Sequence, residues 1–349
     1  MYSCSINNFY IRLVKETWRT KPPVIYYGTT TFGSSHVPAL QDPDFASKFL
    51  DSVHSTGITQ IDTAARYPPD NHGGSERMLG TIHAAEKGFT INTKVLFAGQ
   101  SSDGTLSLEA VRRSAESSLK HLGIKKIGIL YAHCPDEVTP LEEQAQALSE
   151  QLALGHCEKY GVSNFSVNTL ERFIEICEEK GYPKPEVYQG QYNLICRGPE
   201  KELIPLLRKY NMIFNAYSPL GGGFLTGKLT TGNAAGTRLG SAYGAHFTNM
   251  YNHPEFHDAV RGLLKVIEPL GIKPTEAALR WCAYHSILSE KDGIILGATK
   301  PEQIIANMED IKKGPLPQVV VSEIADIGRK IDEMGGGDFE IKPSKLPPK

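Results

Sequence analysis

The chain has 349 residues, of which 40% are hydrophobic and 22% are charged, and its formal net charge is −2. This composition is typical of a globular protein with one large domain or two average ones. The nearly balanced charge gives no reason to expect a nucleic acid or an anionic membrane surface as the main partner. No stretch approaches the ~18 consecutive apolar residues of a membrane-spanning helix, so we expect no membrane insertion. The six cysteines are scattered without a C-x-x-C pair, which favours reduced thiols in a cytoplasmic protein over a disulfide or zinc framework.

The first 20 residues carry several basic side chains and one acid, Glu16, but they lack the apolar core of a secretory signal. We expect residues 1–20 to be an N-terminal extension that is disordered or loosely packed. A mitochondrial leader is the alternative interpretation. The extension contains no catalytic motif, so we expect it to be dispensable.

Apolar runs and helical periods alternate through the rest of the chain. Strands are predicted at residues 24–27, 58–61, 89–94, 127–132, 158–162, 186–192, 212–217 and 293–296. Helices are predicted at residues 44–55, 76–85, 108–121, 141–154, 167–179, 200–209, 275–285 and 302–310. Glycines that suit left-handed helix ends follow five of these helices, at Gly57, Gly88, Gly123, Gly155 and Gly181.

Eight strands that alternate with eight helices indicate a parallel α/β protein. We predict a single (β/α)8 barrel, the TIM-barrel fold, over residues 21–335, with added helices near residues 255–270 and 320–334. Residues 336–349 are expected to form a C-terminal tail. An open, doubly wound sheet is the alternative topology.

Three ionisable residues close successive predicted strands: Asp62 the second, Lys94 the third and His133 the fourth. In a barrel of this kind the chemistry lies at the carboxyl ends of the strands. Tyr67 follows Asp62 after a short turn, so the four side chains could form a phenol-based proton relay. The Lys94 ammonium would stabilise the phenolate, Asp62 would orient the ammonium, and His133 would hold a substrate oxygen beside Tyr67. Each residue alone has a structural explanation, because strand-end ion pairs are also common in inactive proteins.

At these strand ends the set Asp62, Tyr67, Lys94 and His133 resembles the catalytic tetrad of the aldo-keto reductase family. The resemblance spans about residues 24–310 and includes five further motifs: Gly73-Gly74-Ser75-Glu76, Gly161-Val162-Ser163-Asn164-Phe165, Tyr188-Gln189-Gly190-Gln191-Tyr192-Asn193, Tyr217-Ser218-Pro219-Leu220 and Ala278-Leu279-Arg280-Trp281. The run from Gly222 to Lys228, together with His133-Cys134-Pro135-Asp136, is most similar to the branch of aflatoxin-aldehyde reductases.

The resemblance implies an NADPH site on the second half of the barrel rim. Nicotinamide contacts are implied for Ser163, Asn164 and Gln189, with Tyr217 stacked on the ring. Further cofactor contacts are implied along the remaining loops, at Ser218, Pro219, Leu220, Gly221, Gly222, Gly223, Lys228, Arg238, Ala298, Thr299, Lys300, Gln303 and Asn307. The three glycines would let the backbone approach the pyrophosphate, and the last predicted helix would present amides to a phosphate. Many members have arginine in place of Gln303, so Lys300 or Arg238 would have to bind the 2′-phosphate here.

Two other motifs are rejected as sites. The run Gly222–Lys228 fits the start of a P-loop, but Leu229 replaces the Ser/Thr that binds Mg²⁺. His253 and His257 are separated by Pro254 and lack a nearby third ligand, so no metal is expected. A Rossmann glycine fingerprint is also missing from the early strand–helix turns.

The sequence thus predicts NADPH-dependent reduction of an aldehyde or ketone, with Tyr67 as the proton donor, His133 as a substrate ligand and a place in specialised metabolism. The alternative is a cofactor-binding regulatory subunit of a membrane protein with slow reductase activity, since the family fold serves that role too. A monomer or homodimer is expected. Substrate identity is left open, because the loops near residues 97–106 and 238–254 follow no known motif. Tyr243, Phe247 and Tyr251 could line an aryl pocket, although the packed face of a helix is the favoured interpretation.

Overall fold

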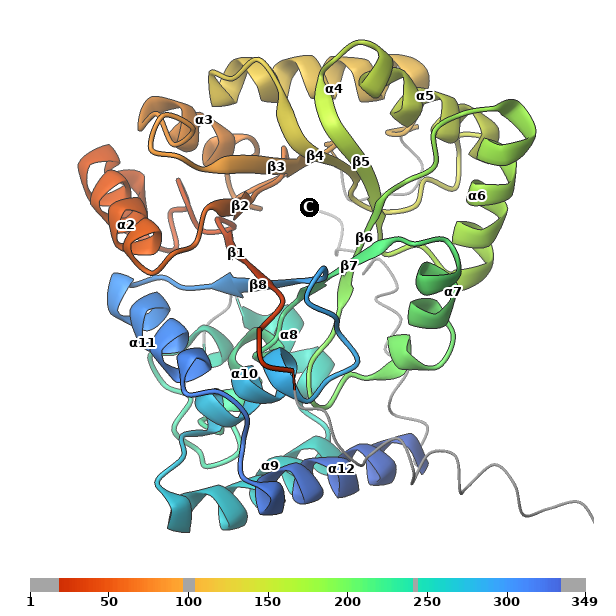
Figure 1. Ribbon diagram of the computed structural model, residues 1–349. Coiled ribbons are helices and arrows are strands. Elements are labelled where there is room, and N and C mark those ends of the chain that lie inside the picture. Colours follow the sequence, from red (N-terminus) through yellow and green to blue (C-terminus); the bar gives the residue numbers. More distant parts are fainter. Residues whose placement is uncertain (1–18, 97–103, 241–243, 334–349) are drawn as a thin grey trace, which may run out of the picture.

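The computed structural model describes residues 19–96, 104–240 and 244–333. Eight parallel strands close into one barrel in chain order, and helices surround it (Figure 1). The strands are β1 (Val24–Gly28), β2 (Gln60–Asp62), β3 (Thr90–Lys94), β4 (Ile127–Ala132), β5 (Cys157–Ser163), β6 (Val187–Gln191), β7 (Ile213–Tyr217) and β8 (Gly293–Gly297). The prediction of a (β/α)8 barrel is confirmed, and the open sheet is excluded.

Eight α-helices follow or precede the strands as predicted: α2 (Pro43–Ser55), α3 (Gly74–Thr81), α4 (Leu108–Leu122), α5 (Leu141–Ala153), α6 (Val167–Lys180), α7 (Leu203–Lys209), α10 (Pro274–Tyr284) and α11 (Pro301–Lys312). Ser107 and Ser166 cap α4 and α6, because each hydroxyl accepts a hydrogen bond from a first-turn amide. Gly123 and Gly181 end the same helices in the left-handed conformation. Helix α3 is shorter than predicted, so Gly88 lies beyond its end rather than capping it.

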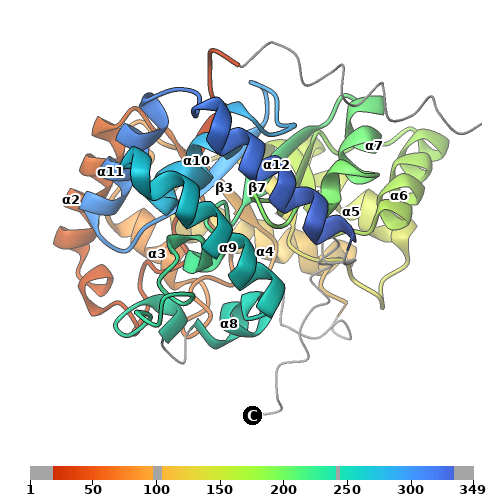
Figure 2. The same ribbon diagram turned by 90° about the horizontal axis from the view of Figure 1, so that it is seen from below.

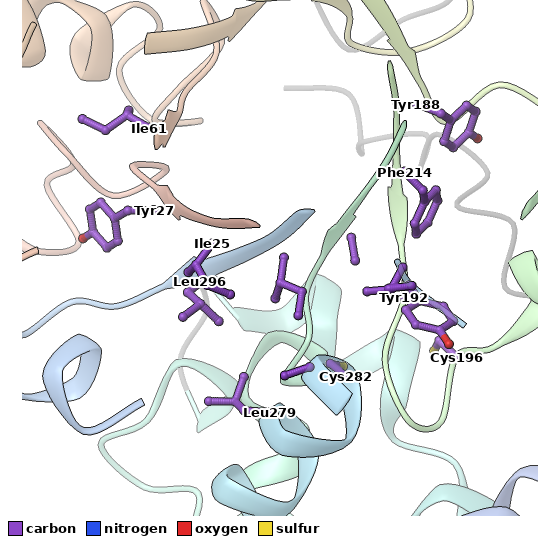
Figure 3. Close-up of a cluster of buried hydrophobic side chains, with 14 of the residues drawn as sticks. Ile25, Tyr27, Ile61, Tyr188, Tyr192, Cys196, Phe214, Leu279, Cys282 and Leu296 are labelled. Atoms are coloured by element: carbon purple, nitrogen blue, oxygen red, sulfur yellow. The ribbon is translucent and has the colours of Figure 1, made fainter. Parts of the chain in front are cut away.

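The layer between strands and helices is apolar. Strands β4 and β6 are buried along their whole length, as expected when helices cover the outside of a parallel barrel. Figure 3 shows part of this core, in which the Tyr192 and Phe214 rings pack edge-to-face and α10 contributes Leu279 and Cys282. The barrel interior holds a smaller, separate apolar cluster of Ile129, Tyr131 and Val187. Burial of apolar side chains therefore holds the helices against the outer face of the barrel, whereas the inside of the barrel carries many polar side chains.

Two added helices lie on the β7–β8 side of the barrel. Helices α9 (Pro254–Ile267) and α12 (Gln318–Glu333) contact each other and run side by side over α10 (Figure 2). Both were predicted within a few residues. Helix α8 (Ala245–Tyr251) lies where the favoured interpretation of Phe247 and Tyr251 expected a helix. The sequence did not indicate the short 3-10 helices η1 (Pro38–Gln41), η2 (Gly198–Glu200), η3 (Gly221–Thr226), η4 (Arg238–Gly240) and η6 (Glu268–Leu270).

One residue of the predicted N-terminal extension contacts the barrel. The Arg19 guanidinium donates hydrogen bonds to the carbonyl and hydroxyl of Ser286, between α10 and β8. Arg19 is therefore attached to the barrel, while residues 1–18 and the tail at 334–349 lie outside the described part of the chain. Within the described residues, no helix is both long enough and apolar enough to cross a membrane.

Candidate active site

Strand register places the predicted relay on one stretch of the barrel rim. Asp62 pairs with Gly28 on one side and with Asn92 on the other, and Lys94 pairs with Tyr131. Because β2, β3 and β4 are neighbours, the side chains that end them project into a shared space. His133 follows β4 directly and shares this space.

A buried ion pair forms the base of the site. The Lys94 Nζ atom lies 2.7 Å from Asp62 Oδ2 and donates a second hydrogen bond to the Thr63 carbonyl at 2.8 Å. Lys94 is 1% exposed and Asp62 is 4% exposed, so neither charge is solvated by bulk water. A buried ammonium with these two partners has one N–H donor left, and the centroid of the Tyr67 ring lies 5.1 Å from Nζ.

Tyr67 is held between this cation and His133. Its ring meets the imidazole edge-to-face, with centroids 5.6 Å apart. Burial raises the pKa of the Tyr67 phenol above its ordinary value, and the nearby Lys94 charge and a hydrogen bond with Thr30 counteract that rise only in part. The Lys94 charge thus favours the phenolate, as expected, but the effect of burial on the pKa of Tyr67 is larger. A high pKa keeps the phenol protonated at neutral pH, as a proton donor requires.

The His133 imidazole is neutral at physiological pH. Burial lowers the pKa of His133 well below its ordinary value, and the positive charges of Lys94 and Arg66 lower it further. A neutral imidazole keeps one N–H donor and can hydrogen-bond a carbonyl oxygen without adding a charge.

The residues expected to contact nicotinamide come from β5, β6 and β7, across the rim. The Tyr217 hydroxyl donates to Asn164 Oδ1 at 2.8 Å, and the Asn164 amide donates to the His133 carbonyl and to Ser163 Oγ, both at 3.0 Å. These bonds join the two halves of the rim. Gln189 differs from expectation, because its amide nitrogen donates to Asp62 Oδ1 at 2.8 Å. Its contact with Asp62 was not predicted from the sequence.

The backbone around this second half is unusual. Asn164 and Ser218 adopt positive φ values of 63° and 56°, which are uncommon for residues with a side chain. Gly221, Gly222 and Gly223 follow at φ 57°, 63° and 107°. A Cβ atom on Gly222 would lie 2.3 Å from the Phe247 ring, so only glycine fits there. Strained backbone gathered at one rim is typical of ligand sites, and the bare glycine backbone suits a pyrophosphate.

The start of α11 differs from the simple phosphate site that the sequence indicated. Gln303 Oε1 accepts hydrogen bonds from the amides of Thr299 and Lys300, at 2.9 Å and 3.2 Å, and so caps the helix itself. Pro301 has no amide hydrogen, so the first turn offers few free donors. Ala298 is buried just after β8, and Lys300 is exposed at the N-terminal end of α11. Asn307 is buried one turn after Gln303. Gln303 therefore has a helix-capping role.

The other two predicted cations, Lys228 and Arg238, follow the run from Gly221 to Gly223 along the chain. The Arg238 guanidinium stacks on Phe247, 4.3 Å from the ring centroid. Lys228 is exposed after η3 and is followed by turns rather than the helix of a P-loop, so the rejection of that motif is supported. Pro219 and Leu220 link β7 to η3.

The three aromatic residues near this loop have different surroundings. Tyr251 is fully buried, stacks on Phe224 and accepts a hydrogen bond from Gln191. It therefore lies on the packed face of a helix, as the favoured interpretation expected. Phe247 covers Gly222 and Arg238, while Tyr243 lies outside the described residues. His257 hydrogen-bonds Thr230 and Asn252, and no group of three possible metal ligands occurs within the described ranges.

Comparison with known proteins agrees with this geometry. The model of the aldo/keto reductase family matches residues 24–329, and the chain belongs to that family. An aldo-keto reductase of Pseudocercospora fijiensis is 33% identical over 78% of this chain and 93% of its own. The oxidoreductase sirO of Leptosphaeria maculans is 32% identical over 89% of this chain and 95% of its own. Human aflatoxin B1 aldehyde reductase member 2 is 30% identical over 87% of this chain and 86% of its own. The protein is thus an oxidoreductase of a family that acts on carbonyl compounds with a nicotinamide cofactor.

Proposed function

We propose that the protein reduces an aldehyde or ketone to the alcohol with NADPH and that Tyr67 is the proton donor. The observation that carries this proposal is the buried Lys94–Asp62 pair directly beside the Tyr67 ring, with a neutral His133 packed edge-to-face against the same ring. A structural ion pair needs no phenol and imidazole gathered around it. A proton relay needs all four groups.

The nicotinamide, when bound, supplies the hydride that reaches the carbonyl carbon. Tyr67 gives its hydroxyl proton to the substrate oxygen, and the resulting phenolate is stabilised by the Lys94 ammonium. Asp62 fixes the direction of the Lys94 ammonium, because the carboxylate accepts one of its hydrogen bonds. His133 donates an N–H to the same substrate oxygen and holds it within reach of Tyr67.

The second half of the rim would hold the cofactor. Asn164 and Ser163 offer a preformed amide–hydroxyl pair for the carboxamide, and the second amide hydrogen of Gln189 is available beside them. The Tyr217 ring, fixed by its bond to Asn164, gives a flat face for stacking. The glycine run from Gly221 to Gly223 suits the pyrophosphate, and Asn307 lies where adenosine would be held.

The preference for NADPH over NADH is assigned to Lys300 and Arg238. Lys300 lies at the start of α11, and Arg238 lies in η4 after the glycine run. The first turn of α11 has a single acid, Glu302, which suits the helix dipole. Gln303 Oε1 already accepts the hydrogen bonds of the Thr299 and Lys300 amides, so side-chain cations would have to bind the 2′-phosphate. A role in specialised metabolism is part of the proposal and is supported by the fungal relatives.

The test is NADPH consumption by purified protein against a panel of aliphatic and aromatic aldehydes and ketones, with Tyr67→Phe as the matched inactive variant. Turnover of at least one compound by the wild type, lost in the variant, is expected. Tight NADPH binding without turnover of any carbonyl compound would favour the alternative of a cofactor-binding regulatory subunit.

A further inference from the structure

A polar cluster interrupts the apolar layer between the barrel and its helices, at the first turn of α3. Ser75 and Glu76 lie in this turn, and α3 lies outside the barrel beside β2 and β3 (Figure 1). Their exposed fractions are 0% and 1%, and the nearby residues Thr29, Thr63 and Thr93 are also fully buried. Buried hydroxyls and a buried carboxylate cost free energy unless they are hydrogen-bonded, so this cluster needs an explanation.

Ser75 holds the ends of two strands. Its hydroxyl donates a hydrogen bond to the Thr29 carbonyl, directly after β1, at 2.9 Å. The Thr63 hydroxyl lies 2.9 Å from Ser75 Oγ, within hydrogen-bond distance. Thr63 directly follows Asp62, and its carbonyl accepts the second hydrogen bond of the Lys94 ammonium. Ser75 is thus joined, through the single residue Thr63, to both members of the buried ion pair.

The same turn also holds Tyr67 and the strand that carries Lys94. The Ser75 amide donates to the Tyr67 carbonyl at 3.0 Å, so the loop that carries the phenol is attached to the helix. The Thr93 hydroxyl donates to Glu76 Oε1 at 2.6 Å. Successive side chains of a strand point to opposite faces, so Thr93 reaches outward to Glu76 while Lys94 faces the interior. Three members of the relay are therefore attached, directly or through a neighbouring residue, to one helical turn.

Helix α3 is itself held tightly against α4, which makes it a fixed support. A Cβ atom on Gly80 would lie 2.0 Å from the His121 carbonyl, far closer than real Cβ contacts. The second carboxylate oxygen of Glu76 lies 3.5 Å from His121 Nδ1. Glu76 therefore contacts β3 through one oxygen and faces α4 with the other.

We propose that Ser75 and Glu76 are positioning residues of the reductase, which set the separation between the Tyr67 phenol and the Lys94 ammonium. The inference rests on the proposed function. Both side chains lie on the outer side of the strands and act through the threonines. Without the Ser75 hydroxyl, Thr63 can shift, and its carbonyl no longer fixes the ammonium beside the phenol.

The readout is the ionisation of Tyr67, which depends on how close Lys94 stays. If Lys94 is less well placed, the phenolate loses stabilisation and the pKa of Tyr67 rises. The loss of one neutral hydrogen bond predicts a rise of about half a unit to one unit. The ionisable groups around the phenol are unchanged in Ser75→Ala: Asp62, Arg66, Lys94, His133, Cys134 and Tyr217.

The experiment replaces Tyr67 with 3,5-difluorotyrosine, whose phenol ionises at lower pH, and follows its ¹⁹F signal during a pH titration of the cofactor-free protein. Ser75→Ala should raise the pKa of the fluorinated residue. Ser118→Ala is the matched control, because it removes a similarly buried hydroxyl from the neighbouring helix α4, and it should leave the titration unchanged. An unchanged titration in Ser75→Ala would overturn the proposal, whatever happens to its melting temperature.

Two variants of Glu76 separate its hydrogen bond from its charge. Glu76→Gln keeps a side-chain oxygen that can accept from the Thr93 hydroxyl, so the titration should stay as in the wild type. Glu76→Met has a similar length without that oxygen, so the pKa should rise as in Ser75→Ala. Identical titrations of the two Glu76 variants would contradict the role of the bond to Thr93.

Kinetics separate positioning from general support of the fold. In natural Tyr67 protein, Ser75→Ala should lower kcat about three- to tenfold while KM for NADPH stays the same. A lower melting temperature with an unchanged kcat would show that Ser75 only supports the fold. The expected ¹⁹F shifts in a protein that reduces no carbonyl compound would reject the proposed function and leave the positioning of Lys94 beside Tyr67 intact.

Discussion

The two halves of the barrel rim are built in different ways. On β2, β3 and β4 the functional side chains contact one another, and the central ion pair is almost fully buried. On β5 to β8 the expected cofactor residues are held by backbone conformation, including the positive φ values of Asn164 and Ser218, and the cations are exposed or stacked on an aromatic ring. The first half is thus preorganised by contacts among its own buried side chains, whereas the second is shaped mainly by its backbone conformation.

The strongest test of the first half is Tyr67→Phe. The ring packing against His133 is kept and the only proposed acid is removed, so turnover should fall by about 10²-fold or more while NADPH still binds. Steady-state kinetics and NADPH fluorescence measure the two effects. Tyr284→Phe is the control, because its hydroxyl bonds the Ile311 carbonyl far from the relay, and it should keep normal turnover. Near wild-type turnover in Tyr67→Phe would remove the basis for the relay.

Lys94→Met should damage both activity and stability. Removal of the ammonium leaves the Asp62 carboxylate buried without its charged partner, which costs about 3–5 kcal/mol of unfolding free energy. Turnover should fall as far as in Tyr67→Phe. The double variant Lys94→Met, Asp62→Leu should recover most of the stability in urea unfolding, because no buried charge remains, and none of the activity. A double variant with restored turnover would show that the pair is structural alone.

In the second half, single substitutions should have smaller effects because the contacts are spread along the loops. Lys300→Met or Arg238→Met should narrow the preference for NADPH over NADH about ten- to a hundredfold, since one charge-assisted phosphate contact is worth ~1.5–3 kcal/mol. Lys312→Met, at the other end of α11, is the matched control. The measurement is the Michaelis constant for NADPH and for NADH in the wild type and in each variant. Equal use of NADH and NADPH by the wild type would contradict the assignment.

Because His133 is neutral, we expect kcat/KM to be independent of its titration on the acid side of the pH profile. Because its pKa is held well below the ordinary value, kcat/KM should show no break near pH 6.5. In the unfolded chain the His133 imidazole binds a proton below about pH 6.5, whereas in the folded protein it stays neutral at that pH. Protonation therefore favours the unfolded state, and the unfolding free energy falls as the pH drops below about 6.5. Histidine ¹⁵N spectra at pH 6 should show a neutral ring. A break near 6.5 that disappears in His133→Asn would contradict this.

The smallest expected effect lies outside both halves. A chain that begins at Arg19 should keep the full melting temperature and turnover. A chain that begins at Lys21 loses the bonds to Ser286 and should lose about 1 kcal/mol of unfolding free energy with unchanged turnover. Thermal melts of the two shortened chains measure the difference. Loss of soluble protein on removal of residues 1–18 would show that the extension closes the barrel.

The sequence by itself determined the barrel and the position of the four proposed relay residues on its rim. Alternating apolar runs and helical periods are local patterns, and Asp62, Lys94 and His133 are visible because each directly follows or ends such a run. In a parallel barrel the residues at strand ends must share one rim, so position along the chain was sufficient to bring them together.

Tertiary structure alone decided how these residues act. The hydrogen bonds of Gln189 with Asp62 and of Asn215 with Tyr131 depend on the register between strands far apart in the chain. The capping role of Gln303 depends on its rotamer, and the high pKa of Tyr67 depends on burial outweighing the nearby Lys94 charge. Residue type and spacing carry no information on solvation, and solvation sets the ionisation of a buried group.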